Sequence, residues 1–560
     1  MAGADGVLNP TRSPTLWVKQ GQENAVDVTE AALTVATRHH RSGRLAEAER
    51  LYRQILLTSP HHGDALFLLA TLLHQQGALD EAEAAYRRAL AARPDHPDSH
   101  NNLGLLLHQR SKSEEARACL AQAIRLRPDF VDAHNNLGLL LHSHGDLDAA
   151  IAHFTAALAV KPDYAAAHNN LGITYFARGD LAEAARCFCR VLALRPDFAE
   201  ASLNLGMVRQ HQGQLHDAIL CFRQALFLEP GSAQAHLGLG SALRQSGRLD
   251  EAQTSLERAV ALAPDLPEIR HQHALALLAT GDYRRGFPDY RPETAGPPST
   301  WKGEALAAGT PLLIDAGPDE GEALLLARYA AFAAAQGARV TLACPPSLVA
   351  LMAGVAGVAE VIDRDGPAPP AHLRVRLTEL PARFGTTFET VPDRVPYLDA
   401  PQGGRLPPAR PGTLRVGLAC QARPATDRLR ALEQERRWCP PEALAPLLAL
   451  PGVTWYSLQP ECPGESCIDL ATQAADLATA AGLLVQLDLV IATDTPLAHL
   501  AGALGCPLWL LVDAIPDWRW LISDGRCRWY PAARLFRQTA AGQWFEPIAA
   551  ICQALASRRP

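Results

Sequence analysis

The stretch His100-Asn101-Asn102-Leu103-Gly104 returns almost unchanged 34 residues later as His134-Asn135-Asn136-Leu137-Gly138, and again as His168-Asn169-Asn170-Leu171-Gly172. A shortened copy, Asn204-Leu205-Gly206, keeps the same phase. Two stricter series share this spacing: the prolines Pro60, Pro94, Pro128, Pro162, Pro196, Pro230 and Pro264, and the alanines Ala48, Ala82, Ala116, Ala150, Ala184, Ala218 and Ala252. A period of 34 residues is typical of a solenoid of helical hairpins.

A helical hairpin explains all three series. The repeated glycine removes a side chain where the first helix of a hairpin must meet the second, and the repeated alanine lies on the second helix at that contact. The proline ends the second helix because it cannot continue a helix interior. The pattern resembles the tetratricopeptide repeat (TPR) and predicts seven full repeats and a diverged eighth within residues 29–292. In the eighth, Gly281-Asp282-Tyr283 keeps the turn between the helices, but Gly286 replaces the expected alanine.

Composition narrows the classes of function. A chain of 560 residues is too long for a single core. A net charge of −7 gives no reason to expect a nucleic-acid partner, since such proteins usually carry a basic surface. We expect no signal peptide in Met1–Gln20 and no membrane segment, since the apolar stretch Thr495–Val512 is predicted to be a helix, a turn and a strand. The twelve cysteines lack zinc-ligand or thioredoxin spacing, so we expect reduced thiols, no metal, no cofactor and a cytoplasmic location.

After residue 310 the periodicity changes to short apolar runs that alternate with helical stretches. The runs predict strands over 311–316, 338–343, 414–419 and 489–493, and the helical stretches predict helices over 320–336 and 472–487. Strand alternating with helix predicts parallel sheets covered on both faces. We therefore expect an α solenoid followed by two Rossmann-type α/β halves, in which ligands bind at the carboxyl ends of the strands. The expected boundaries are a disordered tail over 1–28, a linker over 293–310, a first half over 311–400, a linker over 401–412 and a second half over 413–560.

One strand-to-helix junction is a candidate anion site. A predicted strand ends at Asp494, Thr495 is a suitable N-cap, and Pro496 occupies the first helical position, where it is tolerated. The free amides of such a helix start suit a phosphate, and His499 lies about one turn further on. These residues are also common at ordinary helix starts, and a lone histidine is often only a polar helix residue.

The run from Asp494 to Gly505 resembles the sugar-nucleotide site of heptosyltransferase-like glycosyltransferases with the two-domain GT-B fold. Further stretches share the resemblance: Ser457-Leu458-Gln459, Asp517-Trp518-Arg519-Trp520, Trp529-Tyr530-Pro531, Leu535-Phe536-Arg537-Gln538, Ala327-Arg328-Tyr329, Phe384-Gly385-Thr386-Thr387 and Val395-Pro396-Tyr397-Leu398. The resemblance implies transfer of a sugar from a nucleotide diphosphate to a hydroxyl without a metal. By that resemblance Thr495 and His499 hold the diphosphate of the donor, Asp494 also belongs to the donor site, and Gln459 lies near the nucleotide.

Two positions depart from that family. Glu322 stands where the family has an aspartate base, and a glutamate can accept a hydroxyl proton only if its carboxylate reaches hydrogen-bond distance. Glu320 and Glu322 could equally be first-turn acids that complement the helix dipole. Ala422-Arg423 replaces a Gly-Asn pair near the phosphates, and Arg428 follows. Arg423 and Arg428 are candidate diphosphate ligands, although arginines in a loop are often only solvated.

The repeats carry a second candidate site. Asn102, Asn136, Asn170 and Asn204 share one phase of the first helix of each hairpin, so a superhelix places them in a row. This is similar to the asparagine ladder in the TPR groove of protein O-GlcNAc transferases. Amides can bond the backbone of an extended peptide whatever its sequence, although they could also be solvated polar positions.

Three functions stay open on the sequence. The first is a TPR-containing glycosyltransferase whose groove captures a protein or glycan acceptor. The second is an interaction scaffold with a catalytically lapsed, glycosyltransferase-shaped domain, suggested by the altered turn at Glu322 and by Ala422-Arg423. The third is a sensor that binds a nucleotide sugar without transferring it.

Overall fold

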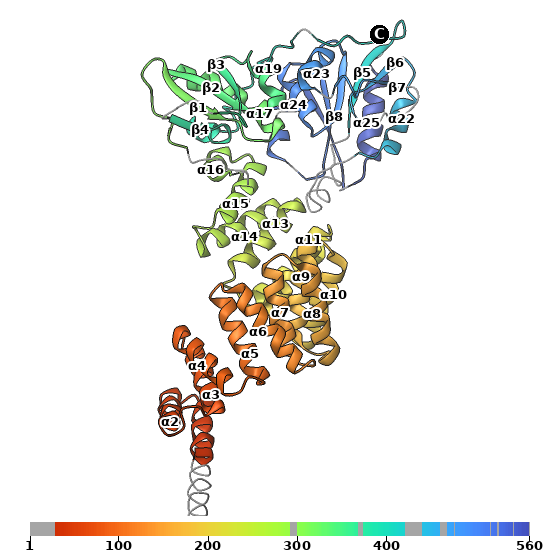
Figure 1. Ribbon diagram of the computed structural model, residues 1–560. Coiled ribbons are helices and arrows are strands. Elements are labelled where there is room, and N and C mark those ends of the chain that lie inside the picture. The colour runs from red at the N-terminus through yellow and green to blue at the C-terminus, as the bar shows by residue number, and fades with distance from the viewer. Residues whose placement is uncertain are drawn as a thin grey trace, which may run out of the picture. The chain divides into compact units, whose positions relative to one another are not determined.

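The computed structural model describes residues 29–291, 299–367, 373–401, 403–420, 439–459, 467–474, 476–515, 517–523, 526–540 and 542–558. The predicted tail and residues 292–298 lie outside these ranges, as do Arg423 and Arg428. The chain divides into two compact units, Met1–Asp197 and Phe198–Pro560. Each unit is described by itself, with the element labels of Figure 1.

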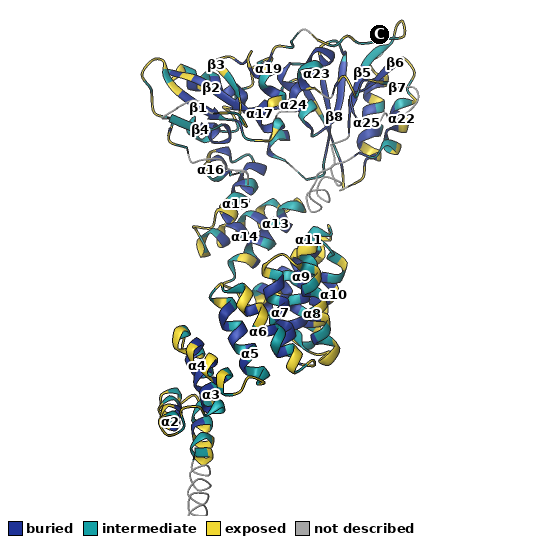
Figure 2. Cartoon of the chain, in the orientation of Figure 1, coloured by how far each residue is buried: buried dark blue, intermediate teal, exposed yellow. Residues whose placement is uncertain are grey.

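The first unit is a run of helical hairpins, as the 34-residue period predicts. A helix over 29–41 precedes α2 (Leu45–Thr58), α3 (Gly63–Gln75), α4 (Leu79–Ala92), α5 (Pro97–Gln109), α6 (Ser113–Leu126), α7 (Val131–Ser143), α8 (Leu147–Val160), α9 (Ala165–Arg178) and α10 (Leu181–Leu194). The dark inner faces of these helices in Figure 2 mark the buried stripe along which they pack.

The repeated glycine permits the helix contact for the reason expected from the sequence. A Cβ atom on Gly138 would lie 2.7 Å from Cε1 of Phe154, which is fully buried on the second helix of the hairpin. A Cβ on Gly104 would lie 2.7 Å from Cγ of Leu120. These distances are shorter than van der Waals contact, so any larger residue here would force the helices apart.

The second unit begins with α11 (Ala199–His211), α12 (Leu215–Leu228), α13 (Ala233–Gln245), α14 (Leu249–Leu262) and α15 (Pro267–Ala279). The second helix of the eighth hairpin is reduced to α16 (Tyr283–Gly286) and a 3-10 turn, η1 (Phe287–Asp289). The last repeat is therefore truncated after its turn.

The first α/β half is a four-stranded sheet in the order β3-β2-β1-β4, with all neighbours parallel. Its strands are β1 (Thr310–Asp315), β2 (Ala338–Cys344), β3 (Val358–Asp363) and β4 (Leu373–Arg376), and its short helices include α19 (Val349–Met352) and α20 (Leu380–Arg383).

The single helix predicted over 320–336 is wrong, because three segments replace it: α17 (Glu320–Leu326), η2 (Ala327–Tyr329) and α18 (Ala330–Ala335). Nε of Arg328 donates to the Leu325 carbonyl at 3.0 Å, and a continuous α-helix would use that carbonyl for the Tyr329 amide.

The second half is a six-stranded parallel sheet in the order β12-β9-β8-β5-β6-β7. Numbered within this half, the order is 6-5-4-1-2-3, which is that of doubly wound dinucleotide-binding folds. The strands are β5 (Leu414–Ala419), β6 (Val453–Ser457), β7 (Cys467–Asp469), β8 (Leu489–Thr493), β9 (Leu508–Val512) and β12 (Ala533–Arg537); the helices include α22 (Ala445–Leu448), α23 (Leu477–Leu484), α24 (Pro496–Ala503) and α25 (Phe545–Ala556).

Two details of the second half refine the sequence predictions. The helix expected over 472–487 begins only at Leu477, because the Asp476 carboxylate caps it by accepting from the amides of Ala478 and Thr479. The apolar stretch 495–512 is a helix, a turn and a strand, as predicted. None of the described helices is long and apolar enough to cross a bilayer.

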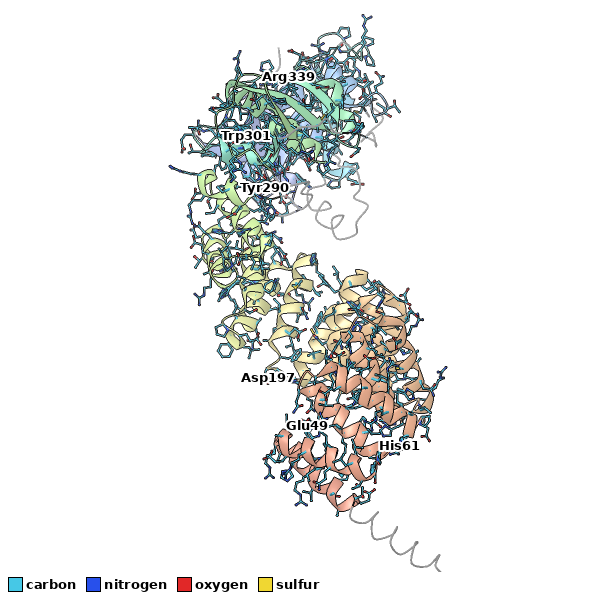
Figure 3. All side chains as sticks on the ribbon, turned by 60° about the vertical axis from the view of Figure 1, so that its left-hand side comes forward. Glu49, His61, Asp197, Tyr290, Trp301 and Arg339 are labelled. Atoms are coloured by element: carbon cyan, nitrogen blue, oxygen red, sulfur yellow. The ribbon has the colours of Figure 1, made fainter. Side chains whose placement is uncertain are left out.

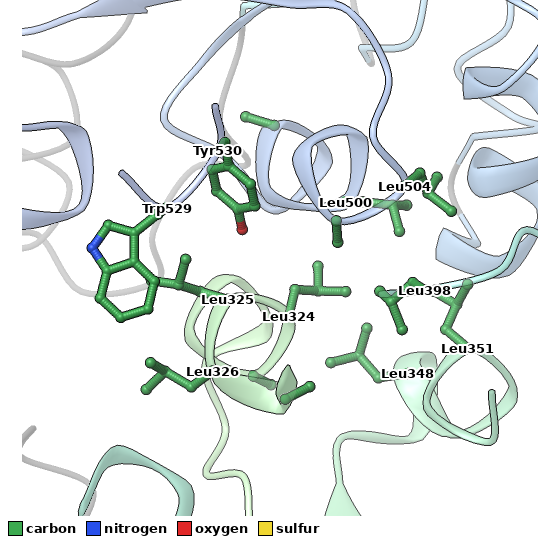
Figure 4. Close-up of a cluster of buried hydrophobic side chains, with 14 of the residues drawn as sticks. Leu324, Leu325, Leu326, Leu348, Leu351, Leu398, Leu500, Leu504, Trp529 and Tyr530 are labelled. Carbon is green, nitrogen blue, oxygen red and sulfur yellow. The ribbon is translucent and has the colours of Figure 1, made fainter. Parts of the chain in front are cut away.

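One hydrophobic core joins the end of the helical array to both α/β halves. Figure 3 marks Tyr290, where the chain leaves the array. The Tyr283 hydroxyl donates to the Trp518 carbonyl at 2.7 Å, and the Phe287 ring packs edge-on against the Trp518 ring at 5.4 Å. Leu324 of α17 faces Leu500 of α24 (Figure 4). The truncated repeat therefore ends as part of the α/β core.

Candidate functional site

Each parallel sheet has a topological switch point, where connections leave to opposite sides. In the first sheet it lies between β1 and β4, and in the second between β5 and β8. Ligands of open α/β sheets bind at these points, outside the carboxyl ends of the strands. The turn before α17 leaves β1, and the Asp494-Thr495 turn leaves β8, so the two predicted motifs lie at the two switch points.

The start of α24 differs from the prediction in one respect. Thr495 is the N-cap residue by position, but its side chain makes no capping hydrogen bond. The backbone carbonyl of Thr495 instead accepts from the amides of Ala498 and His499, at 3.0 and 3.2 Å. Thr495 is 7% exposed, and its Oγ1 is buried without a hydrogen-bond partner among the described residues. A buried hydroxyl in that state has unused capacity to bond a ligand.

His499 is buried at this helix start and held on several sides. Its Nδ1 lies 3.1 Å from the Tyr530 hydroxyl, and its Nε2 lies 3.4 Å from Oδ1 of Asp494. Its ring stacks on the Trp520 ring with a centroid distance of 4.9 Å and an interplanar angle of 25°. Only 3% of His499 is exposed. The histidine is therefore a core residue of the site rather than a solvated helix residue.

The first α/β half also contacts His499, through Gly321. A Cβ atom on Gly321, in the first turn of α17, would lie 3.0 Å from Cδ2 of His499 and 3.5 Å from its Nε2. A side chain at position 321 would therefore press on the imidazole. Because residue 321 is a glycine, the two switch points can lie in direct contact.

Glu322 lies next to this contact and is 6% exposed. Its Oε1 accepts hydrogen bonds from the Tyr290 hydroxyl and from the Arg519 guanidinium, the latter at 2.5 Å. Arg519 also pairs with Asp517 at 3.1 Å and donates to the Tyr290 hydroxyl at 3.1 Å. Tyr290, Glu322 and Arg519 thus form a buried polar cluster, which we call the Glu322 cluster, built from the end of the array and from both halves.

The charges of the cluster stabilise each other. Burial acts to lower the pKa of Arg519, but Asp517, Tyr290 and Glu322 outweigh it and hold that pKa well above its ordinary value. Burial raises the pKa of Tyr290 well above its ordinary value, so the hydroxyl keeps its proton. The negative charge of Asp494 also raises the pKa of Arg519, so the Glu322 cluster interacts electrostatically with the start of α24.

The structure brings together four of the site residues predicted from the sequence. Glu322, Asp494, Thr495 and His499 lie at the meeting point of the two switch points. Gln459 is elsewhere on the carboxyl edge of the second sheet, where its Oε1 accepts from the Cys420 amide at 2.8 Å and joins the ends of β5 and β6. Arg423 and Arg428 lie outside the described residues.

The asparagine row is more internally bonded than the sequence suggests. In the first unit, Nδ2 of Asn136 donates to Oδ1 of Asn101, and Nδ2 of Asn170 donates to Oδ1 of Asn135, both at 2.9 Å. Asn102 accepts from Asn101 at 3.0 Å. Asn136 and Asn170 are partly exposed, so a ligand in the groove can reach them. Asn204 belongs to the second unit.

Sequence reasoning missed the residues that hold His499 and Glu322. Arg519, Trp520 and Tyr530 lie in stretches that carry the family resemblance, but no spacing rule gives them a role. Tyr290 had no sequence signal, because its partner Glu322 is 32 residues away across the predicted linker. Only the folded chain shows these contacts.

Comparison with known proteins identifies the helical array. Tetratricopeptide repeat family models match residues 39–106, 101–165, 143–197, 169–215 and 203–267. Residues 39–267 are therefore tetratricopeptide repeats, as the 34-residue period predicted. Protein FlbA of Caulobacter vibrioides (strain ATCC 19089 / CIP 103742 / CB 15) is 31% identical over 139 residues, which cover 22% of this chain and 22% of FlbA.

Several solved structures resemble part of the chain. PilW, a type IV pilus biogenesis factor, is 22% identical, with a TM-score of 0.36 over 37% of this chain and 96% of PilW. YrrB, described as a TPR protein with an unusual peptide-binding site, is 21% identical, with a TM-score of 0.30 over 33% of this chain and 96% of YrrB. PilF of Pseudomonas aeruginosa is 20% identical, with a TM-score of 0.35 over 38% of this chain and 96% of PilF.

Proposed function

We propose that this TPR protein is a glycosyltransferase that takes a sugar from a nucleotide diphosphate and delivers it to a hydroxyl of a protein or glycan held by the repeats. The observation that supports this most is the contact between Gly321 and His499. Through it, the switch points of two Rossmann-type sheets meet at one polar centre. A sugar nucleotide and its acceptor must bind side by side for transfer. A centre shared by both switch points lets one half hold the donor and the other half hold the acceptor.

The residues of the second half suit the diphosphate. The amides at the start of α24 and its positive dipole end attract an anion, and the unpartnered Thr495 hydroxyl can donate to it. The contact between Nε2 of His499 and Asp494 is long at 3.4 Å, so a phosphate oxygen can replace Asp494 as the acceptor for this nitrogen. Arg519 supplies a buried positive charge nearby. These groups offset the charge that develops on a departing nucleoside diphosphate.

Glu322 is the candidate base on the side of the first half. Its Oε1 is engaged by Tyr290 and Arg519, so an acceptor hydroxyl must approach the other carboxylate oxygen or displace one of these donors. A base works only within hydrogen-bond reach of the proton it removes. The acceptor itself is expected in the groove of the repeats, where Asn102, Asn136 and Asn170 can bond an extended peptide backbone.

The test is a panel of nucleotide-diphosphate sugars added to the full chain, with thermal shift and release of nucleoside diphosphate as readouts. We expect at least one sugar nucleotide to bind, and His499→Ala to weaken it by roughly tenfold or more, as for loss of a hydrogen bond to a charged group. Glu322→Gln should keep binding and lose turnover. A wild-type chain that binds no sugar nucleotide refutes the proposal.

The Glu322 carboxylate already accepts two hydrogen bonds, and this favours a second candidate function: an interaction scaffold that has lost catalysis. The carboxylate is 6% exposed and bonded to two donors, and His499 is 3% exposed. In this case the α/β part supports the end of the repeat array and the repeats bind a protein partner. Turnover in the wild type that disappears in Glu322→Gln rules this candidate out. The cytoplasmic location stays a prediction.

A further inference from the structure

The imidazole of His499 has two nitrogens in different surroundings, and these determine which one carries the proton. Nε2 faces the Asp494 carboxylate at 3.4 Å. A lone pair there would face a negative charge, whereas an N–H would face an acceptor. The carboxylate therefore favours the tautomer with hydrogen on Nε2. In that tautomer Nδ1 is an acceptor and needs a donor.

Tyr530 is that donor. Its hydroxyl lies 3.1 Å from Nδ1, on the opposite side of the ring from Asp494. Burial raises the pKa of Tyr530 well above its ordinary value, so the hydroxyl stays protonated and able to donate. The Tyr530 side chain is 1% exposed, and a Cβ on Gly502 would lie 2.5 Å from its ring, so the ring is held against α24.

The neighbours of Tyr530 favour donation of its hydrogen to His499. The Tyr397 hydroxyl is 3.5 Å away but donates its own hydrogen to the Leu324 carbonyl at 2.9 Å. The Arg328 guanidinium faces the Tyr530 ring at 5.3 Å and the Tyr397 ring at 4.1 Å, and it donates to the carbonyls of Pro392 and Trp529 at 2.5 and 3.0 Å. The Tyr397 oxygen can still accept from Tyr530 at 3.5 Å, but Nδ1 of His499 is closer at 3.1 Å and is therefore the favoured acceptor of the Tyr530 proton.

We infer that Tyr530 is a positioning residue, which holds His499 as the Nε2–H tautomer and so presents a hydrogen-bond donor to an anion at the start of α24. The inference rests on the proposed function for the identity of the anion, a diphosphate. The tautomer itself is a property of the free protein. It follows the general rule that the hydrogen bond at one ring nitrogen sets the state of the other.

The experiment compares the wild type with Tyr530→Phe and with Tyr397→Phe, all as full chains. Each substitution removes one hydroxyl of the Tyr397–Tyr530 pair, but only the first removes a bond to His499. Histidine labelled with 15N and 13C reports the tautomer through long-range 15N–1H correlations, and His499→Gln assigns the signal. Binding of UDP, ADP and inorganic pyrophosphate is measured in parallel by calorimetry.

We expect His499 to be the Nε2–H tautomer in the wild type and in Tyr397→Phe, and a mixture of tautomers in Tyr530→Phe. Binding of the probe that the wild type takes should weaken about fivefold to tenfold in Tyr530→Phe and about twofold or less in Tyr397→Phe. An Nδ1–H tautomer in the wild type, or an unchanged tautomer in Tyr530→Phe, overturns the inference. A wild type with the expected tautomer that binds none of the probes refutes the proposed function and leaves the role of Tyr530 at His499 supported.

Discussion

Replacing Glu322 by alanine should destabilise the α/β part severely, because it leaves Arg519 with a buried positive charge. The side chains of Glu322 and Arg519 are 8% and 16% exposed, so solvent screens the pair little. Breaking a buried ion pair by removing one partner costs about 3–5 kcal/mol. Asp517 still faces Arg519 at 3.1 Å and offsets part of this, so we expect about 3 kcal/mol. Glu322→Gln keeps an acceptor oxygen for both donors and should cost about 1–2 kcal/mol.

Tryptophan fluorescence makes this change measurable in the full chain. Trp17 is the one tryptophan before residue 301, so the signal reports on the α/β part. With a slope of about 3 kcal/mol per molar urea, the expected loss moves the unfolding midpoint down by about 1 M. Glu320→Ala is the matched control, since it removes a carboxylate from the same helix turn without breaking an ion pair. If Glu322→Ala unfolds within about 0.5 kcal/mol of that control, the Glu322 cluster does not join the parts as described.

Three further predictions concern other parts of the molecule. Gly138→Ala places a Cβ atom 2.7 Å from a buried ring and should cost about 1–3 kcal/mol in thermal unfolding, whereas Gly231→Ala, which meets nothing within 4 Å, should be nearly neutral. The hydrogen bond from Arg415 lowers the pKa of Asp488, so this pair adds stability that is present above about pH 4 and is lost as the pH falls through the folded pKa. Because the Asp488 side chain is 34% exposed, Asp488→Asn should remove only about 0.5 kcal/mol at pH 7 in urea unfolding, and a larger loss would show that solvent does not screen the pair. Burial lowers the pKa of His153, so circular dichroism should show a loss of stability as the pH falls below about 6.5, and His153→Gln should reduce that loss.

The repeat architecture could be predicted from the sequence because every hairpin needs the same residue types at the same helix contacts. Glycine opposite a large side chain, alanine on the facing helix and proline at the hairpin end recur every 34 residues, so a local pattern determines the array. The strands of the α/β part were also predicted closely, β5 and β8 to the residue. Buried parallel strands are short apolar runs, and these stand out between helical stretches.

The site could be predicted only where a local motif carries it. Asp494, Thr495 and His499 share one turn of chain, so sequence alone brought them together. The cluster around Glu322 joins residues from three distant segments, Tyr290, Glu322 and Arg519, and no local rule selects such partners. The same holds for Tyr530, which meets His499 from 31 residues away.

The most direct test of the account is a crystal structure of the full chain with the nucleoside diphosphate that it binds best. The account predicts phosphate oxygens at the start of α24, within hydrogen-bond distance of Nε2 of His499 and of Oγ1 of Thr495, with Gly321 still facing the imidazole. Phosphates bound elsewhere on the chain, with His499 covered and unchanged, would contradict it.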